Sequence, residues 1–253
     1  MERVRLFGFD FIAAVDHDPV LNYLNHRKPD SGKLPFLITP NVDQLVKYHR
    51  SENQELLRTM RQAELVLPDG QPIIWASRWK SGTASLPARL TGSDLFPLLW
   101  KQLKEEGKKV FFILPEASMG EDLSKEYERC RFYAPPLFDL ENDEEYIKVK
   151  EACLSILREQ EPDHVMIGLG FPKQERLALD LYHDAIGKDS FYSLLGASFE
   201  FYLGRKKRAP QWMQRTGLEF VHRMFSEPGR MIKRYLIDDL AFLPLLWREL
   251  RRP

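Results

Sequence analysis

The residues best suited to chemistry lie in one stretch of the chain, Asp163 to Glu175, which reads DHVMIGLGFPKQE. Its apolar half is typical of a central parallel strand, in which Gly168 and Gly170 let other atoms approach the backbone closely. Pro172 suits the first turn of a following helix, so the polar residues after it would surround a helix N-terminus. Exposed N–H groups and the positive end of the helix dipole attract anions there. We therefore expect a phosphate-bearing ligand at this turn.

Polar residues also follow other apolar runs. Asn41, in Thr39-Pro40-Asn41, is predicted to cap a helix, and Asp69 lies in the turn Pro68-Asp69-Gly70. Ser93 or Asp94 is predicted to cap the helix that starts near residue 95. Taken singly, each has an equally simple explanation as an ordinary cap or turn. Their shared placement at the carboxyl ends of predicted parallel strands favours convergence on one crevice.

The elements that would position these residues alternate along the chain. Helical spacing of apolar residues separates the apolar runs, which is typical of an α/β domain with a mostly parallel sheet. The predicted strands are Val4 to Phe9, Phe36 to Thr39, Glu64 to Leu67, Lys109 to Leu114, His164 to Gly170 and Phe191 to Gly196. The predicted helices include Val42 to Arg50, Gln71 to Trp79, Asp94 to Glu106, Asp143 to Glu159 and Gln174 to Ala185.

Composition narrows the class of protein. The chain has 253 residues, of which 43% are hydrophobic, so it can bury the core of one large or two modest domains. Its two cysteines, Cys130 and Cys153, form neither a disulfide framework nor a metal-binding spacing, and no signal peptide opens the chain. The longest apolar run near the end, residues 240–247, is too short to span a membrane. These features indicate a cytoplasmic globular protein.

The formal net charge of zero hides an uneven distribution. Residues 205–253 carry twelve Lys and Arg against five Asp and Glu, a balance of +7, so residues 1–204 carry −7. We therefore place the domain boundary near Gly204. The alternation of basic and apolar residues beyond it predicts an amphipathic surface for anionic lipid, phosphorylated substrates or nucleic acid. The simpler alternative is a solvated face over a packed stripe.

Several familiar sites are absent from the sequence. There is no Walker A motif, no third glycine at position 173 to complete a dinucleotide fingerprint, and no nucleophile elbow around any serine. The six histidines lack zinc-binding spacing. Asp16-His17-Asp18 forms an Asp-x-Asp triplet, but it precedes Pro19 and an amphipathic run. The triplet reads better as a helix start capped by Asp18, so we expect no metal site.

Five blocks of sequence, in consistent order, resemble one bacterial family. They are Thr39-Pro40-Asn41, Pro68-Asp69-Gly70, Arg89 to Leu95, Gly168 to Glu175, and the long block from Gly196 through Arg208-Ala209-Pro210 to Phe220. The similarity runs from about Thr39 to Tyr235. On these blocks the chain resembles the WecG/TagA/CpsF family, the family 26 glycosyltransferases.

The resemblance implies a Rossmann-like α/β fold with a helical C-terminal appendage. It also implies inverting, metal-independent transfer of a sugar from a UDP-sugar to a polyprenyl-diphosphate-linked saccharide, with no cofactor, in the synthesis of bacterial surface polysaccharide. The reaction would take place at the inner face of the cytoplasmic membrane, where residues 205–253 would cover the active site and contact anionic lipid. Similar enzymes use N-acetylmannosamine, its uronic acid or glucose, so the identity of the sugar stays open.

The resemblance further implies roles for single residues. Asp69 matches the proposed general base. Lys233 stands where the family more often has arginine, and lysine keeps the charge but loses the bidentate fork. The residues that match positions against the substrates or the leaving group are Thr39, Asn41, Arg89, Gln174, Arg223, Arg230 and Lys233.

Two other classes of function are compatible with the residues themselves. A nucleotide-sugar-binding regulator could use the same crevice without catalysis. A nucleic-acid-binding protein would rest on the basic segment alone, and the acidic residues 1–204 weaken that alternative. Self-association is a further open point, because apolar residues uncovered by movement of the appendage would favour it.

Overall fold

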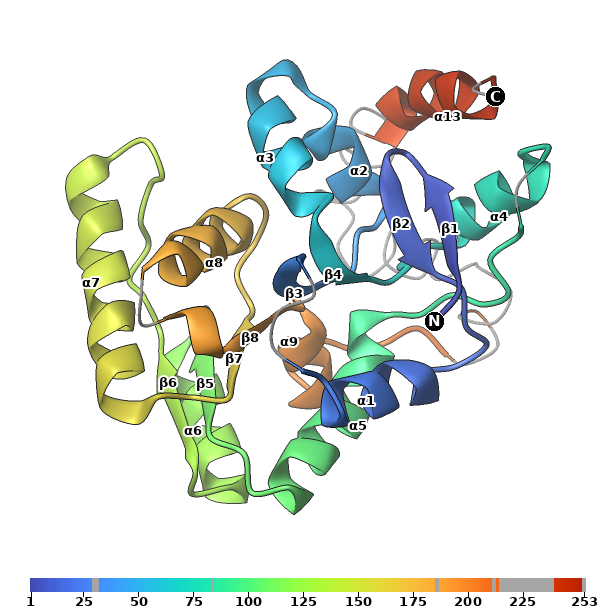
Figure 1. Ribbon diagram of the computed structural model, residues 1–253. Helices are drawn as coiled ribbons and strands as arrows, with labels where there is room; N and C mark the ends of the chain where they lie inside the picture. Colours follow the sequence, from blue (N-terminus) through green and yellow to red (C-terminus); the bar gives the residue numbers. More distant parts are fainter. Residues whose placement is uncertain (29–31, 83, 185–186, 211–212, 214–238, 252–253) are drawn as a thin grey trace.

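The computed structural model describes residues 1–28, 32–82, 84–184, 187–210, 213 and 239–251. At its centre is a six-stranded parallel sheet in the order β4-β3-β8-β7-β5-β6 (Figure 1). The predicted α/β class with a mostly parallel sheet is therefore confirmed. The strands are β3 (Leu34–Ile38), β4 (Ala63–Val66), β5 (Val110–Ile113), β6 (Cys130–Tyr133), β7 (His164–Ile167) and β8 (Phe191–Leu194).

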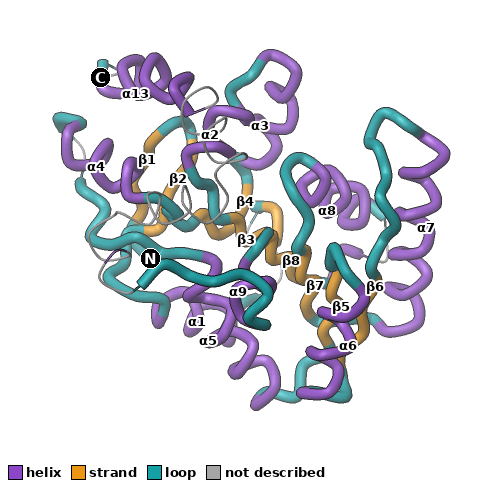
Figure 2. The backbone as a smooth tube through the Cα atoms, turned by 180° about the vertical axis from the view of Figure 1, so that it is seen from behind, coloured by secondary structure: helices purple, strands orange, loops and turns teal. Residues whose placement is uncertain are grey.

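Side chains of the sheet alternate between two hydrophobic clusters, one on each face. In β5, Phe111 and Ile113 belong to one cluster, and Val110 and Phe112 belong to the other, as expected for a strand covered on both faces. Helices cover both faces (Figure 2). On the first face lie α2 (Val42–Tyr48), α3 (Gln54–Met60), α4 (Gln71–Trp79), α7 (Asp143–Gln160) and α8 (Lys173–His183), and on the second α1 (Asp18–Asn25), α5 (Gly92–Glu105), α6 (Ala117–Glu126) and α9 (Ser198–Tyr202).

The first predicted strand, Val4 to Phe9, is wrong. Residues 3–12 instead form a separate antiparallel hairpin of β1 (Arg3–Leu6) and β2 (Phe9–Ile12). The turn holds Phe7 at φ 51° and Gly8 at φ 81°, the pair of left-handed conformations that a tight hairpin turn requires and that glycine adopts without strain. A continuous apolar run does not show that the chain reverses at its centre.

Two local predictions also differ from the structure. The sheet ends in an edge strand, β6, that was not predicted, because Arg131 is exposed and only Cys130 is fully buried. Asp18 does not cap α1. The helix begins at Asp18, whose N–H donates to Asp16 Oδ1 at 3.0 Å, so the preceding acid of the triplet accepts the free N–H group.

The end of the chain returns to the α/β domain. After a short 3₁₀ turn, η4 (Asp239–Ala241), helix α13 (Phe242–Leu250) packs near α2 and α4 (Figure 1). The Phe242 ring lies 5.4 Å from that of Phe7. Lys80 Nζ lies 2.8 Å from Glu249 Oε1, and their side chains are 8% and 4% exposed. No helix within the described ranges is long and apolar enough to cross a membrane.

Most of the predicted basic amphipathic segment, residues 214–238, lies outside the described residues. Two other short 3₁₀ turns, η1 (Ser51–Asn53) and η2 (Gly187–Asp189), complete the elements of the described chain.

Candidate active site

A cavity of about 390 Å³ opens at the carboxyl ends of five neighbouring strands. Residues that follow β3, β4, β5, β7 and β8 line this cavity. The predicted convergence of residues at the strand ends on one crevice is therefore confirmed. Of the predicted site residues, the described lining includes Thr39, Asn41, Asp69 and Gln174. The lining also includes Asp43, Gln44, Lys47, Thr91, Ser93, Pro115, Gly168 to Phe171, Leu194 to Ser198, Glu200, Phe201 and Lys206.

On the β3 side, the cavity is lined by two residues that cap helix α2. Asn41 begins α2 as predicted: its Oδ1 accepts the Gln44 N–H at 3.1 Å, and Gln44 Oε1 accepts the Asn41 N–H at 3.1 Å. This reciprocal capping box satisfies two N–H groups that the first turn would otherwise leave unpaired. Both side chains are therefore fixed where they meet the cavity.

Asp69 stands in the turn after β4, and its half-buried carboxylate lines the cavity. Its N–H donates to Pro40 O at 3.3 Å, which ties the turn to the segment after β3. The loop before α5 contacts the same turn, since the Leu90 N–H donates to Pro68 O at 3.0 Å. The backbone thus holds this carboxylate at the sheet edge independently of its side-chain contacts.

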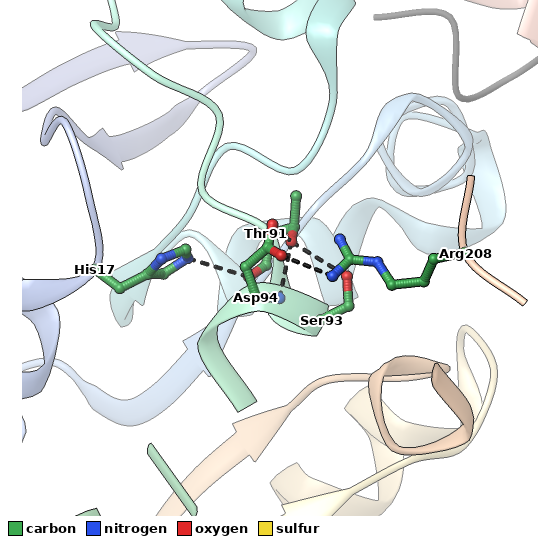
Figure 3. A network of polar contacts seen from close by, with 5 residues as sticks. All are labelled: His17, Thr91, Ser93, Asp94 and Arg208. Atoms are coloured by element: carbon green, nitrogen blue, oxygen red, sulfur yellow. Dashed lines mark hydrogen bonds and ion pairs between the residues drawn. The ribbon is translucent and has the colours of Figure 1, made fainter. Parts of the chain in front are cut away.

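The N-terminus of α5 contributes Thr91 and Ser93 to the lining, and both belong to a network of polar contacts (Figure 3). The predicted cap, Ser93 or Asp94, is wrong: Thr91 is the N-cap, and its Oγ1 accepts the Asp94 N–H at 3.0 Å. Thr91 Oγ1 also donates to Asp94 Oδ2 at 2.7 Å and lies 3.2 Å from Ser93 Oγ. Two residues that line the cavity, Thr91 and Ser93, are therefore held by the same group of hydrogen bonds.

An arginine from the segment after α9 joins this wall. Arg208 Nη1 donates to Asp94 Oδ1 at 2.7 Å, and His17 Nε2 lies 3.2 Å from Thr91 O (Figure 3). Burial would raise the pKa of Asp94, but hydrogen bonds from Arg208 and Thr91 outweigh it and hold that pKa below its ordinary value. Burial lowers the pKa of His17, although the negative charge of Asp94 acts to raise it. No local sequence pattern indicated the pairing of Arg208 with Asp94.

Gly168 and Gly92 permit close packing around the cavity. A Cβ on Gly168 would lie 2.7 Å from Phe199 Cδ2, so the close approach predicted there is confirmed. A Cβ on Gly92 would lie 2.8 Å from Ser198 Oγ, and this contact brings the starts of α5 and α9 together. At Gly170, which lines the cavity, a Cβ would meet no atom of the protein within 4 Å, so the close approach predicted there stays a prediction.

Of the polar side chains at the start of α8, Gln174 reaches the cavity and Lys173 does not. Pro172 lies just before the helix, in the N-cap position, and not in its first turn. The Lys173 ammonium donates to Phe138 O and lies 4.4 Å from the centroid of the Phe138 ring. Lys173 is therefore engaged away from the lining, whereas Gln174 enters it.

Gln174 and Glu175 are buried polar residues whose side chains are in contact. Gln174 Nε2 donates to Glu175 Oε1 at 3.0 Å, and the Tyr48 hydroxyl donates to the same oxygen at 3.4 Å. Gln174 Oε1 and Glu175 Oε2 have no hydrogen-bond partner in the described part of the chain. Burial raises the pKa of Glu175 to about 7, against the opposing hydrogen bonds from Gln174 and Tyr48. The burial of Glu175 was not foreseen, since its only signal was its place at a helix start.

The charges of the described lining are nearly balanced. Lys47 Nζ lies 2.9 Å from Asp43 Oδ2, and Lys206 Nζ lies 2.8 Å from Glu200 Oε2, so both lysines are in ion pairs. Asp69 adds a further carboxylate. Three acidic and two basic residues give this lining a formal charge of −1. The described lining therefore has no excess of positive charge.

The remaining predicted cations are not placed in the lining. Arg89 is half-buried in the loop between α4 and α5, beside the turn that carries Asp69, and is not among the described lining residues. Arg223, Arg230 and Lys233 lie outside the described residues. Roles for these four residues stay predictions.

Comparison with known proteins identifies relatives over nearly the whole chain. A family model described as "Glycosyl transferase WecG/TagA/CpsF family" matches residues 4–253. An N-acetylglucosaminyldiphosphoundecaprenol N-acetyl-beta-D-mannosaminyltransferase of Bacillus spizizenii is 26% identical over 201 residues, 79% of this chain and 75% of the relative. Enzymes of the same name from Bacillus subtilis and Staphylococcus aureus are 23% and 26% identical, and cover 89% and 90% of this chain and 84% and 87% of their own.

Proposed function

The chain belongs to the WecG/TagA/CpsF glycosyltransferase family, and from this premise we propose that it transfers N-acetylmannosamine from a UDP-sugar to a polyprenyl-diphosphate-linked N-acetylglucosamine. The relatives carry this donor sugar and this kind of acceptor in their names. The observation that supports the proposal most directly is the cavity at the carboxyl strand ends, which brings Thr39, Asn41, Asp69 and Gln174 into one lining.

In the proposed reaction, Asp69 acts as general base. Its carboxylate takes the proton of the acceptor hydroxyl, and the acceptor oxygen forms a bond to the anomeric carbon. The bond from that carbon to the UDP oxygen breaks on the opposite face, so UDP leaves with the electron pair and the configuration inverts. No cofactor takes part in this sequence of steps.

The departing diphosphate gains negative charge, which positive groups must stabilise. Because the described lining has a formal charge of −1, we assign this role to Arg89, Arg223, Arg230 and Lys233. Thr39 and Asn41 are assigned to binding of the substrates. Residues 1–204 would then form the catalytic domain, and residues 205–253 would cover the site and contact the anionic inner face of the cytoplasmic membrane.

The test of the activity uses the purified full chain, a soluble analogue of the lipid-linked acceptor and UDP-N-acetylmannosamine. We expect one N-acetylhexosamine to be added per molecule of UDP released, as measured by product mass. UDP-glucose and the UDP-linked uronic acid serve as alternative donors. Binding of UDP-sugar without release of UDP would instead support a nucleotide-sugar-binding regulator.

The role of the appendage is better tested by substitution than by truncation. A chain that ends after Gly204 would lose the Phe242 contact with Phe7 and the Glu249 partner of Lys80. Replacement of Arg223 and Arg230 by alanine avoids this damage. We expect the double variant to keep its thermal stability but to lose turnover and co-sedimentation with anionic vesicles, and full retention of both would contradict the proposal.

A further inference from the structure

We propose that Glu175 is a positioning residue, which orients the Gln174 carboxamide so that its Oε1 accepts a hydrogen bond from an O–H or N–H group of the bound UDP-sugar. This inference rests on the proposed function, since it concerns how the same cavity reads its substrate. It assigns a role to a residue that lies behind the cavity wall and does not itself line the cavity.

The orientation of Gln174 follows from the chemistry of its partner. Gln174 and Glu175 are 2% and 1% exposed, and the hydrogen bond between their side chains measures 3.0 Å. An ionised carboxylate has no proton to donate, so the amide must turn its Nε2 toward Glu175. The other end of the amide, Oε1, then faces away from Glu175 and lies near Gly196, which lines the cavity: a Cβ on Gly196 would lie 3.9 Å from Oε1.

The unpaired oxygen points to a ligand. A buried acceptor without a partner is costly to keep, and such atoms in native proteins call for an explanation. Gln174 Oε1 has no partner in the described part of the chain, and its side chain lines the cavity. A bound ligand that supplies a donor would satisfy it.

The same oxygen restricts the kind of ligand group. Ionised phosphates carry only acceptor oxygens, so Gln174 Oε1 does not favour contact with the diphosphate. Sugar hydroxyls, the acetamido N–H and the N–H of a uracil ring are donors that fit. Gln174 is therefore inferred to read the sugar or the base, and the diphosphate is left to the cationic residues.

The groups that hold Glu175 in place come from α2. The Tyr48 hydroxyl donates to Glu175 Oε1 at 3.4 Å, and the Lys47 ammonium on the same helix favours the ionised form. Tyr48 is itself fixed by an edge-on contact with Phe171, with ring centroids 4.8 Å apart. Protonation of Glu175 would create a donor in the pair, and the amide could then turn its N–H group to the cavity.

The experiment compares binding of UDP-N-acetylmannosamine to the wild type and to Glu175→Gln by calorimetry. We expect the wild type to bind the ligand about fivefold more tightly than the variant at about pH 8.5, a ratio that corresponds to one net hydrogen bond. The reason is that a glutamine at position 175 can both donate and accept, so it does not fix the orientation of the Gln174 amide. At about pH 5.5 the two affinities should converge, since Glu175 is then protonated. The ligand titrates identically in both samples, so the ratio of affinities isolates the protein.

Gln174→Met provides the matched control. In that background Glu175→Gln should not change the affinity at either pH, because the oxygen that Glu175 orients is gone. Tyr48→Phe serves as a second probe that leaves the cavity lining intact. It removes a hydrogen bond to ionised Glu175, so the pH midpoint of binding should move upward.

Binding of UDP alone locates the donor group. A fivefold ratio with UDP assigns the contact to the nucleoside, and a ratio seen only with the intact UDP-sugar assigns it to the sugar. A ratio that is equal at both pH values, or one that persists in the Gln174→Met background, would overturn the inference. Failure of the wild type to bind either ligand would count against the proposed function instead.

Discussion

Helices α5 and α8, which begin at the cavity on opposite faces of the sheet, differ in how the polar side chains at their N-termini are hydrogen-bonded. At the start of α5, both oxygens of Asp94 and the hydroxyl of Thr91 have hydrogen-bond partners (Figure 3). At the start of α8, Gln174 Oε1 and Glu175 Oε2 have none in the described chain. Polar side chains can thus serve two purposes: a network whose hydrogen bonds are all made fixes the structure, and polar atoms without a partner can bind a ligand.

Asp69, which lines the same cavity after the edge strand β4, gives the largest expected effect. Asp69→Asn should lower kcat by roughly 10²- to 10⁴-fold, the usual contribution of a general base. The melting temperature and the affinity for UDP should change little, because backbone hydrogen bonds hold the turn. Steady-state kinetics and thermal unfolding test this, and near-normal turnover would remove Asp69 from the role of base.

The α8 side should respond to pH through Glu175. Its pKa is raised by burial from the ordinary 4.5 to about 7 in the folded protein, so its contribution to stability is complete at low pH and is lost as pH rises through that interval. The loss is on the order of 3 kcal/mol. In urea unfolding at about pH 5 and pH 8, wild type should lose more stability than Glu175→Gln by roughly this amount. Parallel changes in both proteins would show that Glu175 is not strained by burial.

The α5 side should respond to loss of its cap. Thr91→Val removes the oxygen that accepts the Asp94 N–H, and it should lower the free energy of unfolding by about 1 kcal/mol. Ser93→Ala is the matched control, since Ser93 neighbours the cap but does not accept that N–H group. Urea unfolding of both variants measures the difference. Equal losses of stability would show that the Thr91 hydroxyl does not cap α5, and the contrast with the unpaired polar atoms of α8 would then fail.

The smallest expected effect comes from the partly exposed ion pair of the α5 side. Arg208→Gln should cost roughly 0.5 kcal/mol, since solvent screens pairs of this kind. The folded pKa of Asp94 is held low, so the contribution of the pair is present above the ordinary pKa of Asp94 and is lost as pH falls. This sign is opposite to that of Glu175. Arg205→Gln, which breaks the exposed pair with Asp122, is the control and should cost less.

Sequence patterns identified those parts of the fold that depend on local chemistry. Apolar runs marked the central strands, and the Asn41 cap was predicted because an N-cap uses residues within one turn. The hairpin at Gly8 was missed, since an apolar run does not say where it reverses. The partly exposed strand β6 was missed because it lacks a continuous apolar run.

The site was predicted as a set of strand ends but not as a set of interactions. Asp94 and Arg208 are 114 residues apart, and no nearby pattern connects them. Buried Glu175 accepts a hydrogen bond from Tyr48, which is 127 residues away on another helix. Long-range packing of this kind decides which of several caps and turns becomes a functional group.

The position of α13 has a consequence for the synthesis of the chain. Phe7, in the first hairpin, is covered by Phe242, and Lys80 is buried against Glu249. A growing polypeptide therefore leaves this apolar surface and this ammonium group open to solvent until residues 242–249 have emerged from the ribosome. The hairpin around Phe7 is thus completed only by residues that are translated long after it.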